Sequence, residues 1–122
     1  METCVFCKII KGELPSYTIY EDDIVKAFLS IEPIGNGHLL IIPKKHFVNI
    51  CDIDIDVLHH INTVSKSMYN LLYEKLKFDG LKFVQNNGCL QDVMHYHLHL
   101  IPTYKDGKKM SLDDVYNILK ND

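Results

Sequence analysis

The sequence predicts one α+β domain, and three observations support this. Short β-prone runs are separated by turn residues, so neighbouring strands should pair as antiparallel hairpins. One segment instead places apolar residues at spacings of three and four, which is typical of an amphipathic helix. The length of 122 residues, 47% of them hydrophobic, suits a single core without an internal boundary. We therefore expect residues 1–122 to form one domain in which a long helix packs across the strands.

The first half of the chain should contain a short helix and three strands. The helix is expected over residues 4–11, before glycine and proline breakers. Residues 17–20 and 24–29 flank an acidic turn and predict a hairpin. Residues 39–42 form a continuous apolar run, which suits a strand buried on both faces, and Pro43 should close it.

The second half should contain the long helix, two strands and a last helix. The apolar stripe of the long helix consists of Val57, Leu58, Ile61, Val64, Met68, Leu71 and Leu72. Gly80 should end this helix, because glycine is common just after helix C-termini. Strands are expected at residues 81–84 and 93–101, the second ended by Pro102. Residues 111–120 should form the last helix, because a serine followed three residues later by an aspartate resembles a capping box.

Charge and hydropathy exclude several classes of function. The 13 basic and 16 acidic residues give a net charge of −3, which provides no basic footprint for nucleic acid or an anionic membrane. No apolar run approaches the ~20 residues of a membrane span, and the first residues lack the features of a signal peptide. We therefore expect a cytoplasmic protein without nucleic-acid or membrane partners. Its cysteines should be reduced, and Cys51 is expected to be buried and neutral.

Three histidines alternate with other residues in the fifth expected strand. Side chains at i, i+2 and i+4 share one face of a strand, so His95, His97 and His99 should form a row of about 13 Å. The intervening residues should anchor the strand in the core: Tyr96, Leu98 and Leu100. Three adjacent imidazoles need hydrogen-bond partners and would repel one another if protonated, which favours a functional role. The alternatives are a solvated sheet face and a cupin-type metal site, but the glutamate that a cupin needs does not follow.

The histidine row and its surroundings resemble the histidine-triad family of nucleotide-binding proteins. The family strand alternates histidine with apolar residues, as residues 95–101 do. Other blocks follow the family order between residues 4 and 104, namely residues 6–10, 20–22, 27–28, 38–46, 86–88 and 91–93. The resemblance implies a five-stranded antiparallel sheet with one long helix and short terminal helices. It also implies a homodimer with a pocket for a purine nucleoside monophosphate beside the histidines.

The same resemblance implies a role for each site residue. His97 would be the nucleophile, forming a nucleotidyl-histidine intermediate that water hydrolyses. His99 would hydrogen-bond the phosphate, and the backbone carbonyl of His95 would orient His97. Gln91 and the backbone after it would bind the phosphate and the departing group. The residues matched to the nucleotide pocket are Phe6, Phe28, Ser30, Ile31, His38, Asn86, Asp92 and Val93. For the apolar members of this set, ordinary core packing is the alternative.

The pair Cys4 and Cys7 points to a metal. A thioredoxin-like redox site would need a following βαβ pattern, which is absent. Two thiolates and two imidazoles make a closed tetrahedral zinc site. The resemblance to zinc-binding bacterial members of the family implies Cys4, Cys7, His46 and His95 as structural ligands. His38 competes for the third position but lies nearer the triad in relatives, and two free thiols are the alternative to a metal.

Two departures from the family pattern affect the expected substrate. Relatives usually carry an aspartate after the Ala-Phe block that binds both ribose hydroxyls, and this chain has Ser30 there. Relatives also have a longer, glycine-containing segment between Asn-x-Gly and the glutamine. Here only Cys89 and Leu90 separate Gly88 from Gln91. The loop that wraps the phosphate should therefore be shorter and stiffer.

The sequence thus favours a hydrolase that cleaves nucleoside phosphoramidates or related adenylates through a nucleotidyl-His97 intermediate. Two alternatives stay open. One is a dinucleoside polyphosphate hydrolase. The other is a zinc-stabilised nucleotide-binding interaction protein with little catalysis, which Ser30 and the short loop favour.

Overall fold

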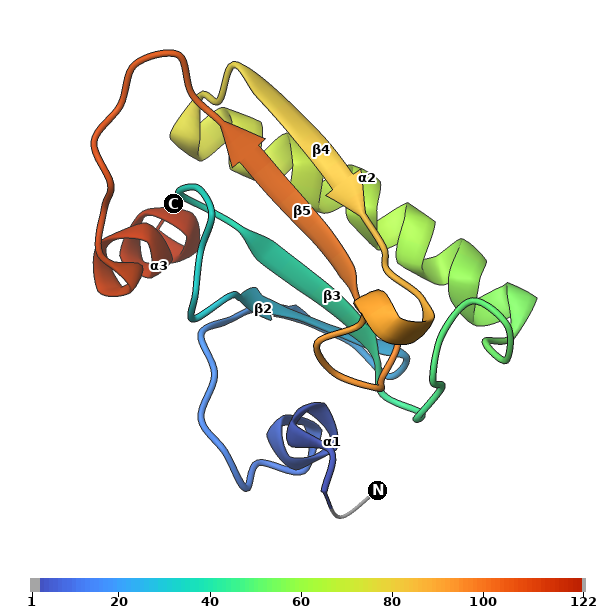
Figure 1. The fold of residues 1–122 in the computed structure, drawn as a ribbon. Helices are drawn as coiled ribbons and strands as arrows, with labels where there is room; N and C mark the ends of the chain where they lie inside the picture. The colour runs from blue at the N-terminus through green and yellow to red at the C-terminus, as the bar shows by residue number, and fades with distance from the viewer. Residues whose placement is uncertain (1–2, 122) are drawn as a thin grey trace.

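The computed structural model describes residues 3–121, and its centre is one antiparallel five-stranded sheet in the order β1-β2-β3-β5-β4 (Figure 1). The strands are β1 (Thr18–Glu21), β2 (Val25–Leu29), β3 (Leu39–Pro43), β4 (Gly80–Val84) and β5 (Leu98–Thr103). The helices are α1 (Val5–Ile10), the long α2 (Ile55–Leu76) and α3 (Leu112–Lys120), with a short 3-10 turn at Gly88–Leu90. The predicted α+β architecture, with one long helix and two short ones, is confirmed.

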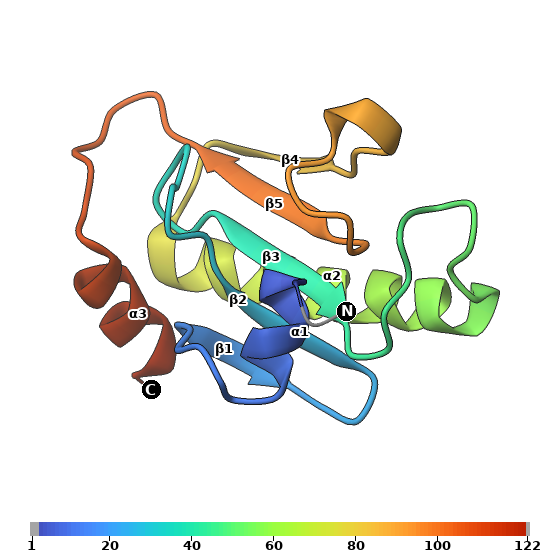
Figure 2. The same cartoon turned by 60° about the horizontal axis from the view of Figure 1, so that its bottom comes forward.

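The sheet is covered on both faces, with α2 on one side and α1 on the other (Figure 2). The strand β3 shows why, because its side chains alternate between two apolar clusters. Leu39 and Ile41 join the larger cluster with α2 and α3, whereas Leu40 and Ile42 join a smaller cluster with Phe6 of α1. All five residues of β3 are buried, so the continuous apolar run does mark a strand buried on both faces.

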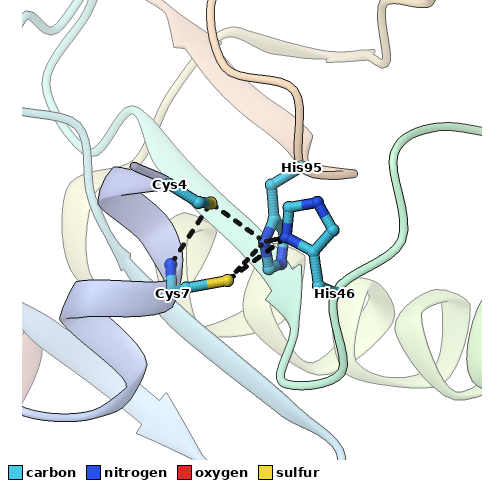
Figure 3. A group of neighbouring side chains, drawn as sticks. All are labelled: Cys4, Cys7, His46 and His95. Carbon is cyan, nitrogen blue, oxygen red and sulfur yellow. Dashed lines mark hydrogen bonds between the residues drawn. The ribbon is translucent and has the colours of Figure 1, made fainter. Parts of the chain in front are cut away.

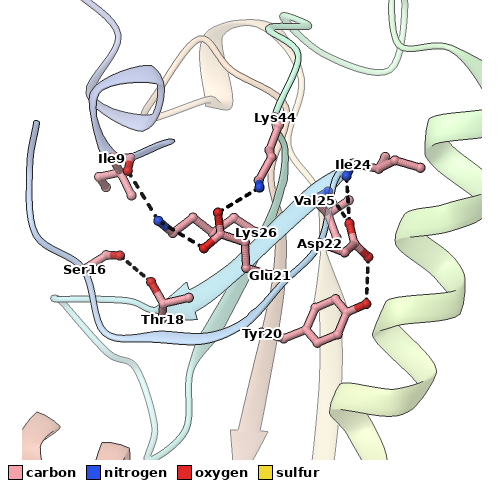
Figure 4. A network of polar contacts seen from close by, with 10 residues as sticks. All are labelled: Ile9, Ser16, Thr18, Tyr20, Glu21, Asp22, Ile24, Val25, Lys26 and Lys44. Atoms are coloured by element: carbon pink, nitrogen blue, oxygen red, sulfur yellow. Dashed lines mark hydrogen bonds and ion pairs between the residues drawn. The ribbon is translucent and has the colours of Figure 1, made fainter. Parts of the chain in front are cut away.

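A polar network attaches α1 to the β1–β2 hairpin (Figure 4). Lys26 is buried in β2, and its Nζ donates to the carbonyl of Ile9 near the end of α1 at 3.4 Å. Glu21 forms ion pairs with Lys26 at 3.8 Å and with Lys44 at 2.8 Å. The Ile9 carbonyl also accepts from the N–H of Gly12 at 3.1 Å, and a cation at this C-terminal end of the helix interacts favourably with the helix dipole. The network therefore fixes α1 where it covers the histidine face of the sheet.

The predicted end of the long helix was wrong. The helix stops at Leu76, and Lys77 adopts the left-handed conformation with φ 49° while its N–H donates to the carbonyl of Tyr73. Gly80 instead begins β4. The reason is that a lysine occupies the left-handed position that usually favours glycine. The last helix was predicted correctly, and the Ser111 side chain accepts from the N–H of Asp114 at 3.1 Å.

The fifth strand begins later and ends later than predicted. Residues 93–97 are irregular, and β5 starts at Leu98. Alternation persists nevertheless, because Tyr96, Leu98 and Leu100 all join the core under α2. Pro102 lies inside β5 and pairs with β4. It is tolerated because the pairing of β5 with β3 ends at Leu100, so the missing N–H falls where no partner strand lies.

The position of Cys51 differs from the prediction. Cys51 was predicted to be buried, but it is exposed in the loop after β3, where its N–H donates to the Asn49 side chain at 2.9 Å. The turn places this side chain outward, so the general preference of cysteine for the core does not apply.

Within residues 3–121, no helix combines the length and apolar character that crossing a membrane requires.

Candidate active site and metal cluster

The four predicted metal ligands lie together at one end of the sheet (Figure 3). Their ligand atoms are all within 4.8 Å of one another. The Nδ1 atom of His95 is 3.4 Å from the Sγ of Cys4 and 3.6 Å from the Sγ of Cys7. The Nδ1 atom of His46 is 3.2 Å from the Sγ of Cys7 and 3.1 Å from the Nδ1 of His95. Helix α1, the loop after β3 and the segment before β5 therefore meet at one point.

This donor set fits a tetrahedral zinc ion. Zn–S bonds of about 2.3 Å and Zn–N bonds of about 2.0–2.1 Å place ligand atoms roughly 3.3–3.8 Å apart, close to the separations found here. The Nε2–H of His95 donates to the carbonyl of Pro43 at 2.8 Å, which leaves Nδ1 free to bind a metal. Burial and the neighbouring Cys4 raise the pKa of the Cys7 thiol. A bound cation would reverse this effect by stabilising the thiolate.

A cavity of about 810 Å³ lies beside the other two histidines, between α1 and the sheet. His97 and His99 form one part of its wall, and Phe6 and Phe28 form another. The Phe6 ring packs edge-on against Phe28 at 5.7 Å and against His97 at 5.1 Å, measured between ring centroids. A largely apolar pocket of this size with a few convergent polar groups suits a nucleoside-sized ligand.

Backbone contacts decide which nitrogen His97 offers to this cavity. The Nδ1–H of His97 donates to the carbonyl of His95 at 2.7 Å. This is the contact that the family resemblance implied. The proton is therefore on Nδ1, and the lone pair is on Nε2. An oriented neutral imidazole with one free nitrogen is the form in which histidine acts as a nucleophile.

A second chain of contacts decides the form of His99. The N–H of Ile34 donates to Nδ1 of His38 at 3.1 Å, so His38 carries its proton on Nε2. That Nε2–H lies 2.9 Å from Nδ1 of His99 and donates to it. His99 must then carry its own proton on Nε2, where it can donate to an anion. Burial, together with the charge of His99, lowers the pKa of His38 to about 4. Burial and His97 also lower the pKa of His99, while Asp92 opposes the effect.

The structure places most predicted pocket residues at this cavity but not all of them. The predicted residues that line it are Phe6, Phe28, Ser30, Ile31, His38, Asp92, Val93, His97 and His99. Phe6 and Phe28 fit both interpretations made from the sequence, core packing and pocket lining, because these side chains are buried and also line the cavity. Ile31 is 76% exposed and lies at the rim. Asn86 is not among the lining residues, and His95 belongs to the metal cluster.

Gln91 also lies outside the cavity lining and instead connects loops. Its Nε2 donates to the carbonyl of Val48 at 2.8 Å, and its Oε1 accepts from the side chain of Asn49 at 3.2 Å. The same Oε1 accepts from the N–H of Gly88 at 2.9 Å. In this structure Gln91 therefore holds the short 88–91 loop against the loop after β3.

The sequence interpretation missed part of the pocket wall. Leu14, Ile34 and Leu40 line the cavity although nothing singled them out. Leu40 had a usable signal, because it lies two residues from Ile42 in a strand buried on both faces. Leu14 and Ile34 lie in loops without periodic pattern, so only the tertiary structure reveals them.

Comparison with known proteins agrees with this geometry. The HIT domain model matches residues 11–106. An uncharacterized HIT-like protein of Methanocaldococcus jannaschii is 43% identical over 119 residues, which cover 94% of this chain and 91% of that protein. The adenosine 5′-monophosphoramidase HNT1 of Saccharomyces cerevisiae is 43% identical over 101 residues, which cover 81% of this chain and 61% of the yeast protein.

A solved structure shows the same fold. A zinc-bound histidine triad family protein from Mycobacterium smegmatis superposes with a TM-score of 0.89 at 31% identity, covering 98% of this chain and 91% of that one. The domain match, the Methanocaldococcus relative and the shared fold all indicate the same family. The chain belongs to the histidine-triad (HIT) family.

Proposed function

We propose that this protein hydrolyses nucleoside phosphoramidates or related adenylates, with His97 as the nucleophile. The observation that carries the proposal is the 2.7 Å contact between Nδ1 of His97 and the carbonyl of His95. It fixes the tautomer whose Nε2 has a lone pair, and His97 lines the large cavity. His99 is held in the complementary form, with a proton available for a phosphate oxygen.

The reaction proceeds in two displacements. Nε2 of His97 attacks phosphorus, a P–N bond to His97 forms, and the bond from phosphorus to the departing nitrogen breaks. The departing nitrogen takes up a proton from solvent, which the water of the second step gives back, and leaves as ammonia or an amine. Water then attacks phosphorus, loses a proton and displaces His97, which returns to its neutral form. One water is consumed, and the products are the amine and a nucleoside monophosphate. His99 stabilises charge on the phosphate oxygens in both steps.

The apolar wall of Phe6 and Phe28 is suited to a purine base, which would insert between α1 and the sheet. Two relatives support the reaction type: the HNT1 proteins of Saccharomyces cerevisiae and Candida albicans are named adenosine 5′-monophosphoramidases, each 43% identical to this chain. An adenosine monophosphate derivative is therefore the substrate to test first.

We also propose that Cys4, Cys7, His46 and His95 hold a structural zinc ion. The metal would tie α1 to the sheet and would take no part in phosphoryl transfer, because all four positions are filled by protein ligands. It would also hold His95, whose carbonyl orients His97. The metal cluster would thus support the nucleophile indirectly, through the backbone.

A homodimer is the remaining proposal. The strand β4 lies at the edge of the sheet, and Phe83 on it is 51% exposed. Tyr73 of α2, which packs against Phe78 just before β4 with ring centroids 5.3 Å apart, is 48% exposed. An apolar open edge of this kind invites pairing with a second sheet. Light scattering on the purified protein tests it, and a monomer mass at micromolar concentration would contradict it.

The central experiment measures turnover of adenosine 5′-phosphoramidate, a dinucleoside polyphosphate and a buffer control. We expect the phosphoramidate to be the preferred substrate and a nucleotidyl adduct on His97 to be detectable by mass spectrometry after rapid quenching. No turnover of the phosphoramidate would overturn the proposed reaction.

A further inference from the structure

The cavity proposed for the nucleotide has an unusual charge. Among the described residues, its lining contains two carboxylates, Glu32 and Asp92, and no lysine or arginine. Of the three histidines in the lining, His38 and His99 compensate little, because burial lowers the pKa of both rings and disfavours their charged forms. The phosphate of the ligand is negative, and this cavity offers carboxylates instead of the cations that would attract it. A ligand group that brings further negative charge is therefore disfavoured there.

A second, smaller cavity adjoins the first at one of these carboxylates. Its volume is about 370 Å³, and it lies on the side of the metal cluster. The two cavities share three wall residues, namely Val5, Asp92 and Val93. The other walls of the second cavity come from Thr3, Cys4, His46 and Met94. Asp92 is therefore the one acidic residue that lines both spaces, and neither space is lined by a lysine or arginine in the described part of the chain.

The Asp92 carboxylate has no structural role that explains it. It is exposed, and within residues 3–121 it forms no hydrogen bond or ion pair. Other aspartates behave differently: Asp22 and Asp52 accept from backbone N–H groups of their own turns. A carboxylate that the fold does not use, at the junction of two cavities, is available to a ligand.

We propose that Asp92 selects the departing group, and that the preferred substrates carry a positive charge on that group, received in the second cavity. The inference rests on the proposed function. The apolar cavity accommodates the nucleoside, and His97 at its wall attacks phosphorus, so the departing group must extend out of this cavity. The adjoining space at Asp92 offers it room together with a negative charge. A cationic amine is attracted there, whereas an anionic group such as a second phosphate is repelled.

The test compares three adenosine 5′-phosphoramidates whose departing amines have equal length. Their far ends carry an ammonium, an uncharged amide and a carboxylate, respectively. We expect kcat/KM to fall in that order, with about a tenfold or greater difference between the two charged compounds at low salt. The preference should shrink at high ionic strength, because the attraction acts across a solvent-exposed site.

Substitutions assign the preference to one side chain. Asp92→Asn should bring the three compounds within about threefold of one another, and Asp92→Lys should favour the carboxylate compound. Glu32→Gln removes the other cavity carboxylate and tests the nucleoside side, so it should leave the charge preference in place. Glu74→Gln removes an equal charge from the exposed face of α2 and should leave all three values unchanged.

Each outcome decides between the two proposals. Equal turnover of the three compounds by the wild type, or a preference that survives in Asp92→Asn, would overturn the role of Asp92 and leave the proposed hydrolase intact. Absence of turnover for every phosphoramidate would overturn the proposed function, and this inference with it.

Discussion

His95 and His97 are two residues apart in the chain, yet they offer opposite ring nitrogens. The Nε2–H of His95 donates to the carbonyl of Pro43, which directs Nδ1 to the cysteine thiols. The Nδ1–H of His97 donates to the carbonyl of His95, which leaves Nε2 for the cavity. The difference teaches that the backbone carbonyl that each ring meets decides which nitrogen it offers, Nδ1 to the four-residue cluster or Nε2 to the cavity.

The surroundings of the two rings differ in the same sense. His95 is fully buried between α1 and the loop after β3, where four donors enclose a small volume. His97 is also buried but forms part of the wall of a large cavity. We therefore expect changes at the metal cluster to act mainly on stability and changes at His97 to act mainly on chemistry.

The largest effect is expected from His97→Ala. This substitution should reduce kcat for adenosine 5′-phosphoramidate by at least about 1000-fold, because covalent catalysis is lost, while AMP still binds. The measurements are steady-state kinetics and calorimetric titration of AMP. His59→Ala, at an exposed position of α2, is the matched control and should retain full activity. Wild-type turnover in the His97 variant would contradict the covalent mechanism.

The second-largest effect is expected on stability, from removal of the proposed metal ligands Cys4 and Cys7. Protein purified without chelator should contain about one zinc per chain. Replacing Cys4 and Cys7 with serine should remove the metal and lower the free energy of unfolding by roughly 3 kcal/mol or more. For a domain of this size that corresponds to a Tm lower by about 10 °C. Thermal unfolding and metal analysis measure both quantities.

The exposed cysteines provide the control for that experiment. Cys51→Ser with Cys89→Ser removes two thiols without touching the cluster, so metal content and Tm should stay at their wild-type values. A cluster variant as stable as the wild type, or a wild type without zinc, would argue that the four residues are no metal site.

The contrast between the two histidines also shows how far the sequence alone leads. The alternation of residues 95–100 predicted the histidine face and the core face correctly, because this period depends only on extended backbone geometry. The same alternation placed the start of the strand too early. Interstrand hydrogen bonds begin only at Leu98, where β3 and β4 supply partners that local sequence does not reveal.

The grouping of Cys4, Cys7, His46 and His95 was predictable only by family resemblance. Its members come from three distant segments, and no local rule joins Cys4 to His95 across 91 positions. The partners of Gln91 escaped prediction for the same reason, because they belong to the loop after β3. The end of α2 also differed from the prediction, because Lys77 adopts the left-handed conformation that was expected of Gly80.

A smaller effect should appear in the pH dependence of stability. His38 faces His99 and has a pKa of about 4 in the folded protein, against about 6.5 in the unfolded chain. Between these values the unfolded state binds more protons, so stability falls as the pH drops from about 6.5 to 4. The loss from His38 is on the order of 3 kcal/mol.

Replacing His38 removes its contribution to the pH dependence of the free energy of unfolding. His38→Gln should therefore lose less stability than the wild type between pH 6.5 and 4, as measured by urea unfolding at several pH values. His59→Gln changes an exposed histidine and should keep the wild-type slope. Parallel curves for wild type and His38→Gln would show that His38 titrates normally.

The smallest effect concerns the ribose end of the cavity. Ser30 stands where relatives usually place an aspartate, and its Oγ already accepts from the N–H of Glu32 at 3.2 Å. A carboxylate forms hydrogen bonds worth roughly 1.5–3 kcal/mol, against about 1 kcal/mol for a neutral hydroxyl. We therefore expect weak AMP binding by the wild type and little discrimination between ribose and 2′-deoxyribose.

Ser30→Asp should restore the charged acceptor and tighten AMP binding by about tenfold, or ~1.4 kcal/mol. The gain should be smaller for 2′-deoxy-AMP, because one of the two hydroxyls is missing. Glu32 is the rival acceptor, since it lines the same cavity and follows Ser30 by two residues in an irregular segment. Titrations of AMP into wild type, Ser30→Asp and Glu32→Ala distinguish the two. Tight binding by the wild type that is lost in Glu32→Ala would show that Glu32 replaces the missing aspartate, because Ser30 alone cannot supply a charged acceptor.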